Sequence, residues 1–335
     1  MKIIVPMAGM GKRLRPHTLT TPKPLLPIAG KPIVQRLVED IVAICKGQVD
    51  EIAYIVGDFG KEAENHLLAV AEKLGAKGTI YYQEEALGTA HAIHCAGNSV
   101  SGEVIVAFAD TLFRADFQLD PTADGVIWVK TVENPKQFGV VTLTPEGHIN
   151  AFVEKPTEFV SDLAIIGIYY FKNGDELMQE IQYLLDNDIR DKGEFQLTNA
   201  LENMKNKGRR FVAGKVDDWM DCGNKENVLA TNTKILDYLA NDSTDLYLPD
   251  NARFQNAWII EPSFIGEGVS IENCIVGPHV SIGKGSQLKN VIVKESILRE
   301  FSQVENAVIE NSILGNHSQF KGKAITLNLG DYTEA

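Results

Sequence analysis

Residues 7–32 read MAGMGKRLRPHTLTTPKPLLPIAGKP and follow an apolar run at residues 3–5, with Pro6 between them. Gly9, Gly11 and Gly30 stand among prolines, lysines and arginines, a composition too irregular for a helix or a strand. An apolar run that stops at such a segment is typical of a buried strand ending in a loop. Glycines let backbone N–H groups approach a phosphate closely, and the cations can meet its charge. The stretch therefore predicts a loop that binds a polyphosphate.

Strand-like and helix-like segments alternate through the residues around this loop. We expect strands at 2–7, 51–56, 78–83 and 103–110, and helices at 32–45, 61–76 and 87–97. The strands are apolar throughout rather than alternating, which indicates a parallel sheet covered on both faces. Such sheets bind ligands beyond the carboxyl ends of their strands, where the opening loop lies.

Residues 124–220 are rich in β-strand patterns, with two expected helices at 173–187 and 195–207. We interpret this region as the antiparallel edge of the same sheet, which adds a lid over the crevice. A helix at 225–242 then ends a first domain, residues 1–242. The predicted fold is α/β, with a Rossmann-like, mixed and mostly parallel sheet.

Residues 243–335 have a different pattern of apolar residues. Apolar residues recur five or six positions apart, at Ile265, Ile271, Val276, Ile282, Leu288, Val293, Leu298, Val304, Ile309, Leu314 and Phe320. Every third member, from Ile271 to Leu288, Val304 and Phe320, follows at steps of 17, 16 and 16 residues. This period suits a triangular coil with one inward residue on each face, the signature of a hexapeptide repeat. We expect a short left-handed parallel β-helix that mediates a homo-oligomer.

Composition narrows the class of partner. The chain has 335 residues and a formal net charge of −13, which argues against binding to nucleic acid or to an anionic membrane surface. No apolar stretch approaches the roughly 18 residues of a membrane-spanning helix, and no signal peptide is evident. Its four cysteines are widely spaced and form no metal or disulfide pattern. We expect a cytoplasmic protein.

Two common phosphate-binding motifs are absent. No GxxxxGK[ST] spacing occurs, and Leu14 stands where a GxGxxG fingerprint needs its third glycine. The segment AGMGKRLRP…TTPKPLLPIAGKPI instead resembles the signature of the sugar-1-phosphate nucleotidyltransferases, also called nucleoside-diphosphate-sugar pyrophosphorylases. QEEALGTAHAI (83–93), VAFADTLF (106–113), NPKQFGVV (134–141), FVEKP (152–156) and WMDCGNKENVLATN (219–232) continue the resemblance. A C-terminal β-helix is also common in that family.

The resemblance implies a reaction and a set of site residues. The enzyme class is the nucleotidyltransferases of EC 2.7.7, in which a sugar-1-phosphate attacks the α-phosphate of an NTP and pyrophosphate leaves, with Mg²⁺ as cofactor. The implied residues are Arg13 and Lys23 for catalysis, Ala8, Gly9, Gly11, Gln83 and Gly88 for the nucleotide, Gly139, Glu154, Lys155 and Gly167 for the sugar phosphate, and Asp110 and Asp221 for the metal. Asp217 and Asp218 compete with Asp221 for its role.

Substrate identity stays open. A glutamine can offer an acceptor and a donor to the imide edge of uracil or thymine, so we favour UTP or dTTP with a hexose-1-phosphate. A GTP-dependent mannose-1-phosphate guanylyltransferase and a non-catalytic subunit that binds sugar nucleotides are the alternatives.

Several positions depart from the resemblance or suggest other chemistry. Lys12 replaces the usual threonine of the phosphate loop. His91 and His94 lie one helical turn apart but have no evident third metal ligand, which favours a structural role. His279 and His317 could act as bases in an acyl transfer, although exposed spacer residues at coil turns explain them more simply.

Overall fold

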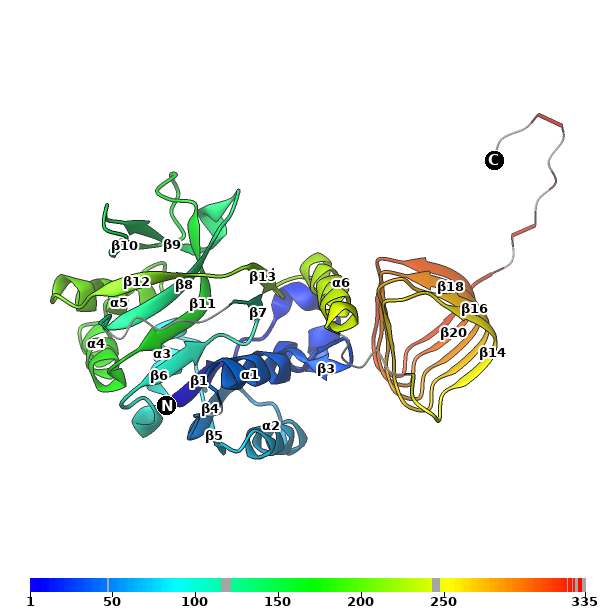
Figure 1. Cartoon of the computed structure of the whole chain (residues 1–335), viewed down its shortest axis with the longest axis horizontal. Helices are drawn as coiled ribbons and strands as arrows, with labels where there is room; N and C mark the ends of the chain where they lie inside the picture. Colours follow the sequence, from blue (N-terminus) through cyan, green and yellow to red (C-terminus); the bar gives the residue numbers. More distant parts are fainter. Residues whose placement is uncertain are drawn as a thin grey trace. The chain divides into compact units, whose positions relative to one another are not determined.

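The computed structural model describes residues 1–46, 48–115, 122–242, 248–323, 325–326, 328 and 331–332. The chain divides into two compact units (Figure 1). The first comprises residues 1–26 and 31–223, and the second comprises 27–30 and 224–335. Among the described residues, no helix is both long and apolar enough to cross a membrane.

The first unit is built on a nine-stranded mixed sheet. The path of seven strands across it runs β10 (Ile149–Glu154), β9 (Gly139–Leu143), β11 (Leu163–Phe171), β6 (Val104–Ala107), β1 (Lys2–Pro6), β4 (Glu51–Val56) and β5 (Lys77–Tyr82). Strands β8 (Gly125–Thr131) and β12 (Phe211–Lys215) extend it, since β8 pairs with both β11 and β12. The predicted parallel half is confirmed, because β6, β1, β4 and β5 pair in parallel. The predicted antiparallel edge is also confirmed, since β11 runs antiparallel to β6, β8 and β9.

Helices cover both faces of this sheet. They are α1 (Ile33–Ile44), α2 (Lys61–Lys73), α3 (Thr89–His94), α4 (Gly174–Asp186) and α5 (Leu197–Asn206). One buried cluster joins Ile4 of β1 with apolar residues of α3, α4 and α5. Its strand neighbours Ile3 and Val5, which point to the opposite face, are also fully buried. A strand buried on both faces explains the continuous apolar runs of the sequence.

One segment differs from its expected form. The strand expected at 103–110 ends at Ala107, and after a turn the chain forms a second strand, β7 (Thr111–Arg114). This strand pairs antiparallel with β13 (Asp218–Asp221) in a separate two-stranded sheet. The sequence suggested one strand because VAFADTLF is apolar on both sides of Asp110 and contains no glycine or proline to mark the turn.

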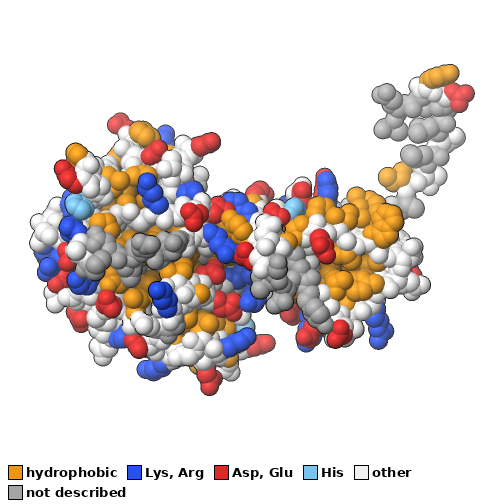
Figure 2. Space-filling model, viewed as in Figure 1, with side chains coloured by type: hydrophobic (Ala, Val, Ile, Leu, Met, Phe, Trp, Pro, Cys, Tyr) orange, Lys and Arg blue, Asp and Glu red, His pale blue; other side chains and the backbone are white. Residues whose placement is uncertain are grey.

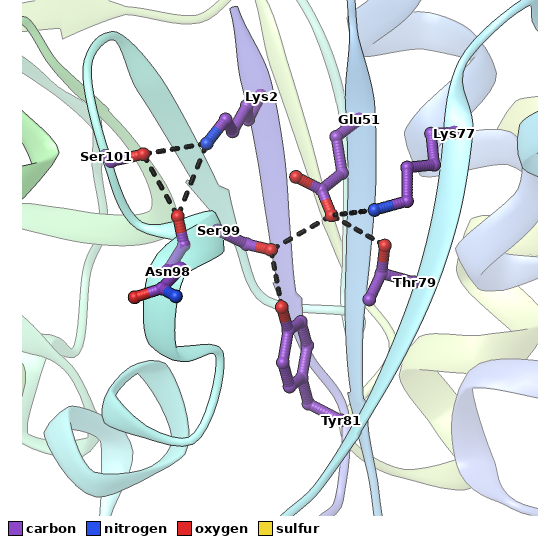
Figure 3. A network of polar contacts seen from close by, with 8 residues as sticks. All are labelled: Lys2, Glu51, Lys77, Thr79, Tyr81, Asn98, Ser99 and Ser101. Atoms are coloured by element: carbon purple, nitrogen blue, oxygen red, sulfur yellow. Dashed lines mark hydrogen bonds and ion pairs between the residues drawn. The ribbon is translucent and has the colours of Figure 1, made fainter.

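The amino ends of the parallel strands are closed by a polar network (Figure 3). Thr79 and Ser99 donate hydrogen bonds to Glu51 Oε1, at 2.6 and 3.0 Å. The Tyr81 and Ser99 hydroxyls are 2.8 Å apart, and Lys2 Nζ donates to Ser101 Oγ at 2.7 Å. The hydroxyls and the Glu51 carboxylate satisfy one another, so the polar groups at this edge of the sheet are bonded within the protein.

The second unit consists of parallel strands and one long helix, α6 (Lys225–Asn241). A five-stranded sheet contains β14 (Arg253–Ile259), β16 (Ser270–Val276), β18 (Gln287–Lys294), β20 (Gln303–Glu310) and β22 (Gln319–Lys321). A four-stranded sheet contains the intervening strands β15 (Ser263–Ile265), β17 (Val280–Ile282), β19 (Ile297–Leu298) and β21 (Ile313–Leu314).

The strand register of this unit reproduces the predicted repeat. Ile271 pairs with Leu288, Leu288 with Val304, and Val304 with Phe320. The predicted inward residues from Ile265 to Ile309 form its buried core. Phe320 differs, at 50% exposure, because no strand follows β22 among the described residues to cover it.

Helix α6 belongs with these strands rather than with the first unit. Asn232, on this helix, accepts hydrogen bonds from Ala29 N at 3.0 Å and from Ser281 Oγ at 2.7 Å. These bonds tie the short strand β2 (Pro27–Ile28) and its turn to α6 and β17. Residues 243–247, where we expect the second domain to begin, lie outside the described residues. The observed division after residue 223 lies before this helix, whereas we predicted a domain boundary after it, at residue 242.

Candidate active site

The loop that follows β1 is folded into three short 3-10 turns, at residues 12–14, 17–19 and 23–25. Gly11 has φ of +58°, and a Cβ at this position would lie 2.9 Å from Lys23 Cβ. Thr18 Oγ1 donates a 2.8 Å hydrogen bond to the Gly11 carbonyl. Glycine is therefore needed here for the close approach of the Lys23 stem.

Lys23 makes an ion pair with Asp110, which lies just beyond the carboxyl end of β6. Lys23 Nζ donates to Asp110 Oδ2 at 2.7 Å, and the two side chains are 13% and 38% exposed. The pair is thus half-enclosed, with the carboxylate still open on one side. The strand order explains the meeting, because β1 and β6 are parallel neighbours and end at the same edge of the sheet.

A first cavity opens at this edge. It is lined by Pro6, Met7, Ala8, Gly9, Lys23, Pro24, Gln83, Ala86, Gly88, Thr89, Ala92, Phe108, Ala109, Asp110 and Glu194. Four of the five residues that the sequence assigns to the nucleotide are in this lining, together with Lys23 and Asp110. Gly11 is the exception, since it lines neither this cavity nor the second one described below.

Gly88 forms the rim of the first cavity at the start of α3. Its φ is +121°, and an added Cβ would lie 2.5 Å from the Phe195 carbonyl oxygen and 2.7 Å from the Phe195 nitrogen. Phe195 N donates to Leu87 O at 2.8 Å and Ala90 N donates to Phe195 O at 2.9 Å, so the two segments are joined by their backbones. Only glycine fits between them.

A second cavity adjoins the first and shares Thr89, Phe108, Asp110 and Glu194 with it. Its lining includes every residue that the sequence assigns to the sugar phosphate and the second metal ligand, namely Gly139, Glu154, Lys155, Gly167 and Asp221. Arg13 also lines this cavity. The predicted residues are thus brought together at one edge of the sheet, with Asp110 in the wall between the two cavities.

Glu154 and Lys155 are held in place by their neighbours. Glu154 accepts a hydrogen bond from Thr198 Oγ1 at 3.2 Å and lies 3.3 Å from Lys155 Nζ. Lys155 has φ of +41°, an unusual value for a residue with a side chain. Lys192 Nζ donates to the Lys155 carbonyl at 2.7 Å and so supports this backbone conformation. Strained, buttressed backbone of this kind concentrates at functional sites.

Asp221 reaches the site through the pairing of β13 with β7. Cys222 N donates to the Asp110 carbonyl at 2.8 Å, which joins the two aspartate segments despite their distance in sequence. A Cβ on Gly223 would lie 2.9 Å from both Arg13 Nη2 and Asp221 Oδ1, so these two charged groups flank the same glycine. This placement favours Asp221 over Asp217 and Asp218, neither of which lines the second cavity.

The donor set at the wall suits a hard divalent cation. The described residues contain no group of three or more His, Cys, Asp or Glu side chains arranged to hold a metal. Mg²⁺ does not need one, since it usually takes one or two carboxylates and completes its shell with water and substrate phosphates. Asp110 and Asp221 line one cavity and supply those carboxylates, so the residues present fit Mg²⁺.

Aromatic side chains enclose the second cavity. Phe138 and Trp219 meet edge to face, with ring centroids 5.0 Å apart. Tyr169 also lines this cavity and meets Phe108 edge to face, with ring centroids 6.1 Å apart. Burial, with the charges of Glu154 and Asp110, raises the pKa of Tyr169 above its usual value, so its hydroxyl stays protonated.

The sequence missed part of the lining. Glu194, Gln196 and Thr198 lie on and just after the loop before α5 and were not assigned a role. Gln196 Oε1 accepts a hydrogen bond from Thr89 Oγ1 at 3.1 Å, which links this loop to the start of α3. The available signal was the polar run RDKGEFQLT, at the start of an expected helix, although composition alone does not separate such a run from an ordinary surface loop.

Comparison with known proteins identifies the family of the chain. The nucleotidyl transferase family matches residues 2–238. The low-salt glycan biosynthesis nucleotidyltransferase Agl11 of Haloferax volcanii is 29% identical over 325 residues, covering 89% of this chain and 87% of that protein. A glucose-1-phosphate thymidylyltransferase of Streptomyces antibioticus is 28% identical over 319 residues, with the same coverage of the two chains.

Other relatives match a smaller share of the chain. The bifunctional protein GlmU of Methanocaldococcus jannaschii is 33% identical over 249 residues, which are 72% of this chain and 56% of that protein. A solved structure of UDP-glucose pyrophosphorylase complexed with UDP-glucose shares the fold, with a TM-score of 0.58 and 24% identity over 71% of this chain and 98% of that one. With the family match spanning most of the chain, these findings show that this protein belongs to the nucleotidyl transferase family, among relatives named as sugar nucleotidyltransferases.

Proposed function

We propose that this protein transfers a nucleotidyl group from UTP or dTTP to a hexose-1-phosphate and releases pyrophosphate. The observation that carries the proposal is the wall between the two cavities. There Asp110, which is ion-paired with Lys23 of the first cavity, lines both the cavity that contains Gln83 and Gly88 and the cavity that contains Glu154 and Lys155. Two adjoining sites with a cation at their junction suit the joining of two phosphorylated substrates.

The reaction is an in-line displacement at phosphorus. An oxygen of the sugar phosphate forms a bond to the α-phosphorus of the NTP, and the bond from that phosphorus to the bridging oxygen of the pyrophosphate breaks. Such reactions depend on positioning and charge stabilisation rather than on a covalent nucleophile of the protein. Lys23 would lie between the attacking and α-phosphates, where negative charge is concentrated in the transition state.

The remaining site residues bind and orient the substrates. Arg13 would neutralise the leaving pyrophosphate, and the backbone of Ala8 and Gly9 would contact the nucleoside. Lys155 would hold the sugar phosphate, with Glu154 and the backbone at Gly139 and Gly167 bonding the sugar hydroxyls. Asp110 and Asp221 would hold Mg²⁺, which when bound supplies charge neutralisation at the phosphates.

The bonding of Gln83 supports the choice of base. Its Nε2 donates to the Gly88 carbonyl at 3.2 Å, which fixes the amide orientation and leaves Oε1 as the group available to a base. An acceptor pairs with the N3–H of uracil or thymine and also with the N1–H of guanine. It does not pair with N1 of adenine or N3 of cytosine, which are acceptors themselves. Uridine and thymidine nucleotides therefore remain favoured, with GTP as the alternative.

We also propose that the C-terminal strands form a left-handed β-helix that assembles the protein into a homo-oligomer in the cytoplasm. The 16- and 17-residue steps of the strand register support the coil. An apolar column on its outer surface supports the oligomer, since Trp258 and Val308 are 75% and 78% exposed and belong to the register column Trp258, Ile275, Ile292 and Val308. Figure 2 shows hydrophobic side chains on the surface of this unit.

Light scattering on the full chain tests the assembly. Changing both Trp258 and Val308 to Glu should reduce the mass in solution without loss of the fold, because these side chains are exposed. An unchanged mass would contradict an interface at this column.

The histidines of the C-terminal unit give no support to a second, acyl-transfer activity. His279 Nε2 lies 2.8 Å from Asp237 Oδ1, and the His317 ring stacks on Phe301 at 5.0 Å. Both contacts serve the packing of the unit. The proposal is therefore confined to nucleotidyl transfer.

Pyrophosphate release tests the proposed function. The full chain is assayed with Mg²⁺, each of UTP, dTTP, GTP and ATP, and a panel of hexose-1-phosphates. We expect release with UTP or dTTP, lost in Lys23→Ala and Asp110→Ala. Lys61→Ala is the matched control, because Lys61 makes a 2.7 Å ion pair with Glu64 that lines neither cavity. Binding of sugar nucleotides without pyrophosphate release would favour a non-catalytic subunit instead.

A further inference from the structure

The Gln83 side chain has a second hydrogen-bond partner in addition to Gly88. Gln83 Nε2 lies 3.1 Å from Nδ1 of His91, which belongs to α3. The Gly88 carbonyl is itself shared, because it also accepts from Ala92 N at 3.1 Å as the first backbone bond of the helix. The Gln83 amide is therefore held by two contacts, one with a carbonyl that also begins the helix and one with His91.

The donor and the acceptor of the contact between Gln83 and His91 can be assigned. Because the Gly88 oxygen can only accept, the atom facing it must be the amide nitrogen of Gln83. That nitrogen has two hydrogens, and its second one faces His91 Nδ1. The geometry is favourable only when Nδ1 has no proton, which is the neutral tautomer protonated at Nε2.

The surroundings of His91 favour the neutral ring. Burial, followed by the positive charge of His94, lowers the pKa of His91 below its usual value of 6.5. The charge of Glu85 and a hydrogen bond to the Glu85 backbone act in the opposite direction but are smaller. The imidazole is then an acceptor at neutral pH, as the contact with Gln83 requires.

We propose that His91 is a positioning residue for base selection, because its unprotonated Nδ1 holds the Gln83 amide with Oε1 toward the nucleotide. This inference rests on the proposed function of the first cavity. His91 does not line that cavity and acts on the base only through Gln83. A simple structural role, which the sequence favours, would leave base preference unaffected by changes at this position.

Uracil and cytosine differ at N3, the ring position that Gln83 Oε1 would contact. Uracil and thymine present N3–H as a donor, whereas cytosine presents N3 as an acceptor. With the amide held by His91, Oε1 pairs with the donor and meets the acceptor unfavourably. When Nδ1 carries a proton, it meets the Nε2 hydrogens of Gln83 as a second donor, so this contact is lost and the amide is held by Gly88 alone.

The direct test is a measurement of the His91 tautomer. ¹⁵N chemical shifts of the full chain, with His91 assigned by the spectrum of His91→Asn, distinguish Nδ1 from Nε2 protonation. We expect an unprotonated Nδ1 at pH 7.5 and a pKa below 6.5. A protonated Nδ1 at that pH would overturn the inference, whether or not the protein turns over a nucleotide.

The functional test compares discrimination between pyrimidines. The readout is the ratio of kcat/KM for UTP over CTP, or for dTTP over dCTP, in the wild type, His91→Leu, His91→Asn and His94→Leu. His91→Leu removes the acceptor and should lower the ratio by about tenfold, the value of one hydrogen bond of about 1.4 kcal/mol. His91→Asn places an amide oxygen near the Nδ1 position and should restore most of the ratio.

The pH profile and the control separate positioning from packing. The wild-type ratio should fall as the pH is lowered below 6.5, whereas His91→Asn should show no such fall. His94→Leu is the matched control, since His94 lies on the same helix and bonds Gln182 at 2.8 Å. An unchanged ratio in His91→Leu, or an equal loss in His94→Leu, would overturn the inference. Absence of turnover in the wild type would refute the proposed function, and the tautomer measurement would then decide this inference alone.

Discussion

The two edges of the central sheet each contain a carboxylate, but the two carboxylates have different surroundings. At the amino edge, the Glu51 side chain is 12% exposed and its carboxylate accepts from Thr79 and Ser99, so the charged group is bonded within the protein (Figure 3). At the carboxyl edge, Asp110 is 38% exposed and faces two cavities, with Lys23 as its ion-pair partner. A polar group bonded inside the fold stabilises it, whereas one that faces a cavity is available to a ligand.

The largest expected effect concerns the carboxyl edge alone. Removal of divalent cations with EDTA should abolish pyrophosphate release, because the substrate phosphates would lose the charge neutralisation of the Mg²⁺ that Asp110 and Asp221 would hold. Adding Mg²⁺ should restore it. The melting temperature without nucleotide should not change, since the described residues contain no metal site of three or more ligands. Full activity in EDTA would contradict the assignment of Asp110 and Asp221.

A second change should separate the two cavities of that edge. Lys155→Met removes the cation of the second cavity while keeping most of the side-chain bulk. The KM for the sugar phosphate should rise by about 10- to 100-fold, as expected for a charged hydrogen bond, while the KM for the nucleotide changes little. Initial-rate kinetics with each substrate varied in turn measures this. Equal effects on both KM values would mean that Lys155 does not distinguish the two substrates.

Glu51→Ala, at the amino edge, should lower stability while leaving activity nearly unchanged. The hydroxyls of Thr79 and Ser99 would lose their acceptor in a buried place, which should lower the free energy of unfolding by about 1–3 kcal/mol. Urea denaturation monitored by circular dichroism gives this value. The kcat at 25 °C should stay within about twofold of the wild type, because Glu51 lies at the opposite end of the strands from the site. A large loss of kcat in a folded Glu51→Ala protein would break the distinction between the two edges.

Tyr81→Phe is the smallest of these changes. It removes one hydroxyl, which lies 2.8 Å from Ser99 Oγ in the same network. The free energy of unfolding should fall by about 0.5–1.5 kcal/mol, less than for Glu51, because Ser99 keeps its bond to Glu51. A loss as large as that of Glu51→Ala would show that the network depends on the tyrosine rather than on the carboxylate.

Much of this organisation could be predicted because it depends on local patterns. The apolar runs of β1 and β4 and the five- or six-residue spacing from Ile265 onward fix which residues are buried, whatever their partners. The residues of the two cavities were predicted for another reason, since the motifs around Lys23, Gln83 and Lys155 match those of a known family.

What could not be predicted depends on contacts between distant segments. The turn at Asp110 is set by backbone bonds to Pro6, Gly167 and Cys222, which lie in three other parts of the sequence. Glu194 enters both cavities because the backbone of Phe195 is joined to Leu87 and Ala90. Gly11 was assigned to the nucleotide, but in the structure it lines the wall of neither cavity. Its positive φ and missing side chain instead allow the close approach of the Lys23 side chain. No local pattern specifies such pairings.

The central claim is that the carboxyl edge of the sheet binds both halves of a nucleotide sugar. A crystal structure of the full chain with Mg²⁺ and the nucleotide sugar identified by the turnover assay tests it most directly. The account predicts the base at Gln83 and Gly88 in the first cavity, the sugar at Glu154 in the second, and the metal bound by Asp110 and Asp221. A nucleotide sugar bound away from this edge, or a metal held by neither aspartate, would contradict it.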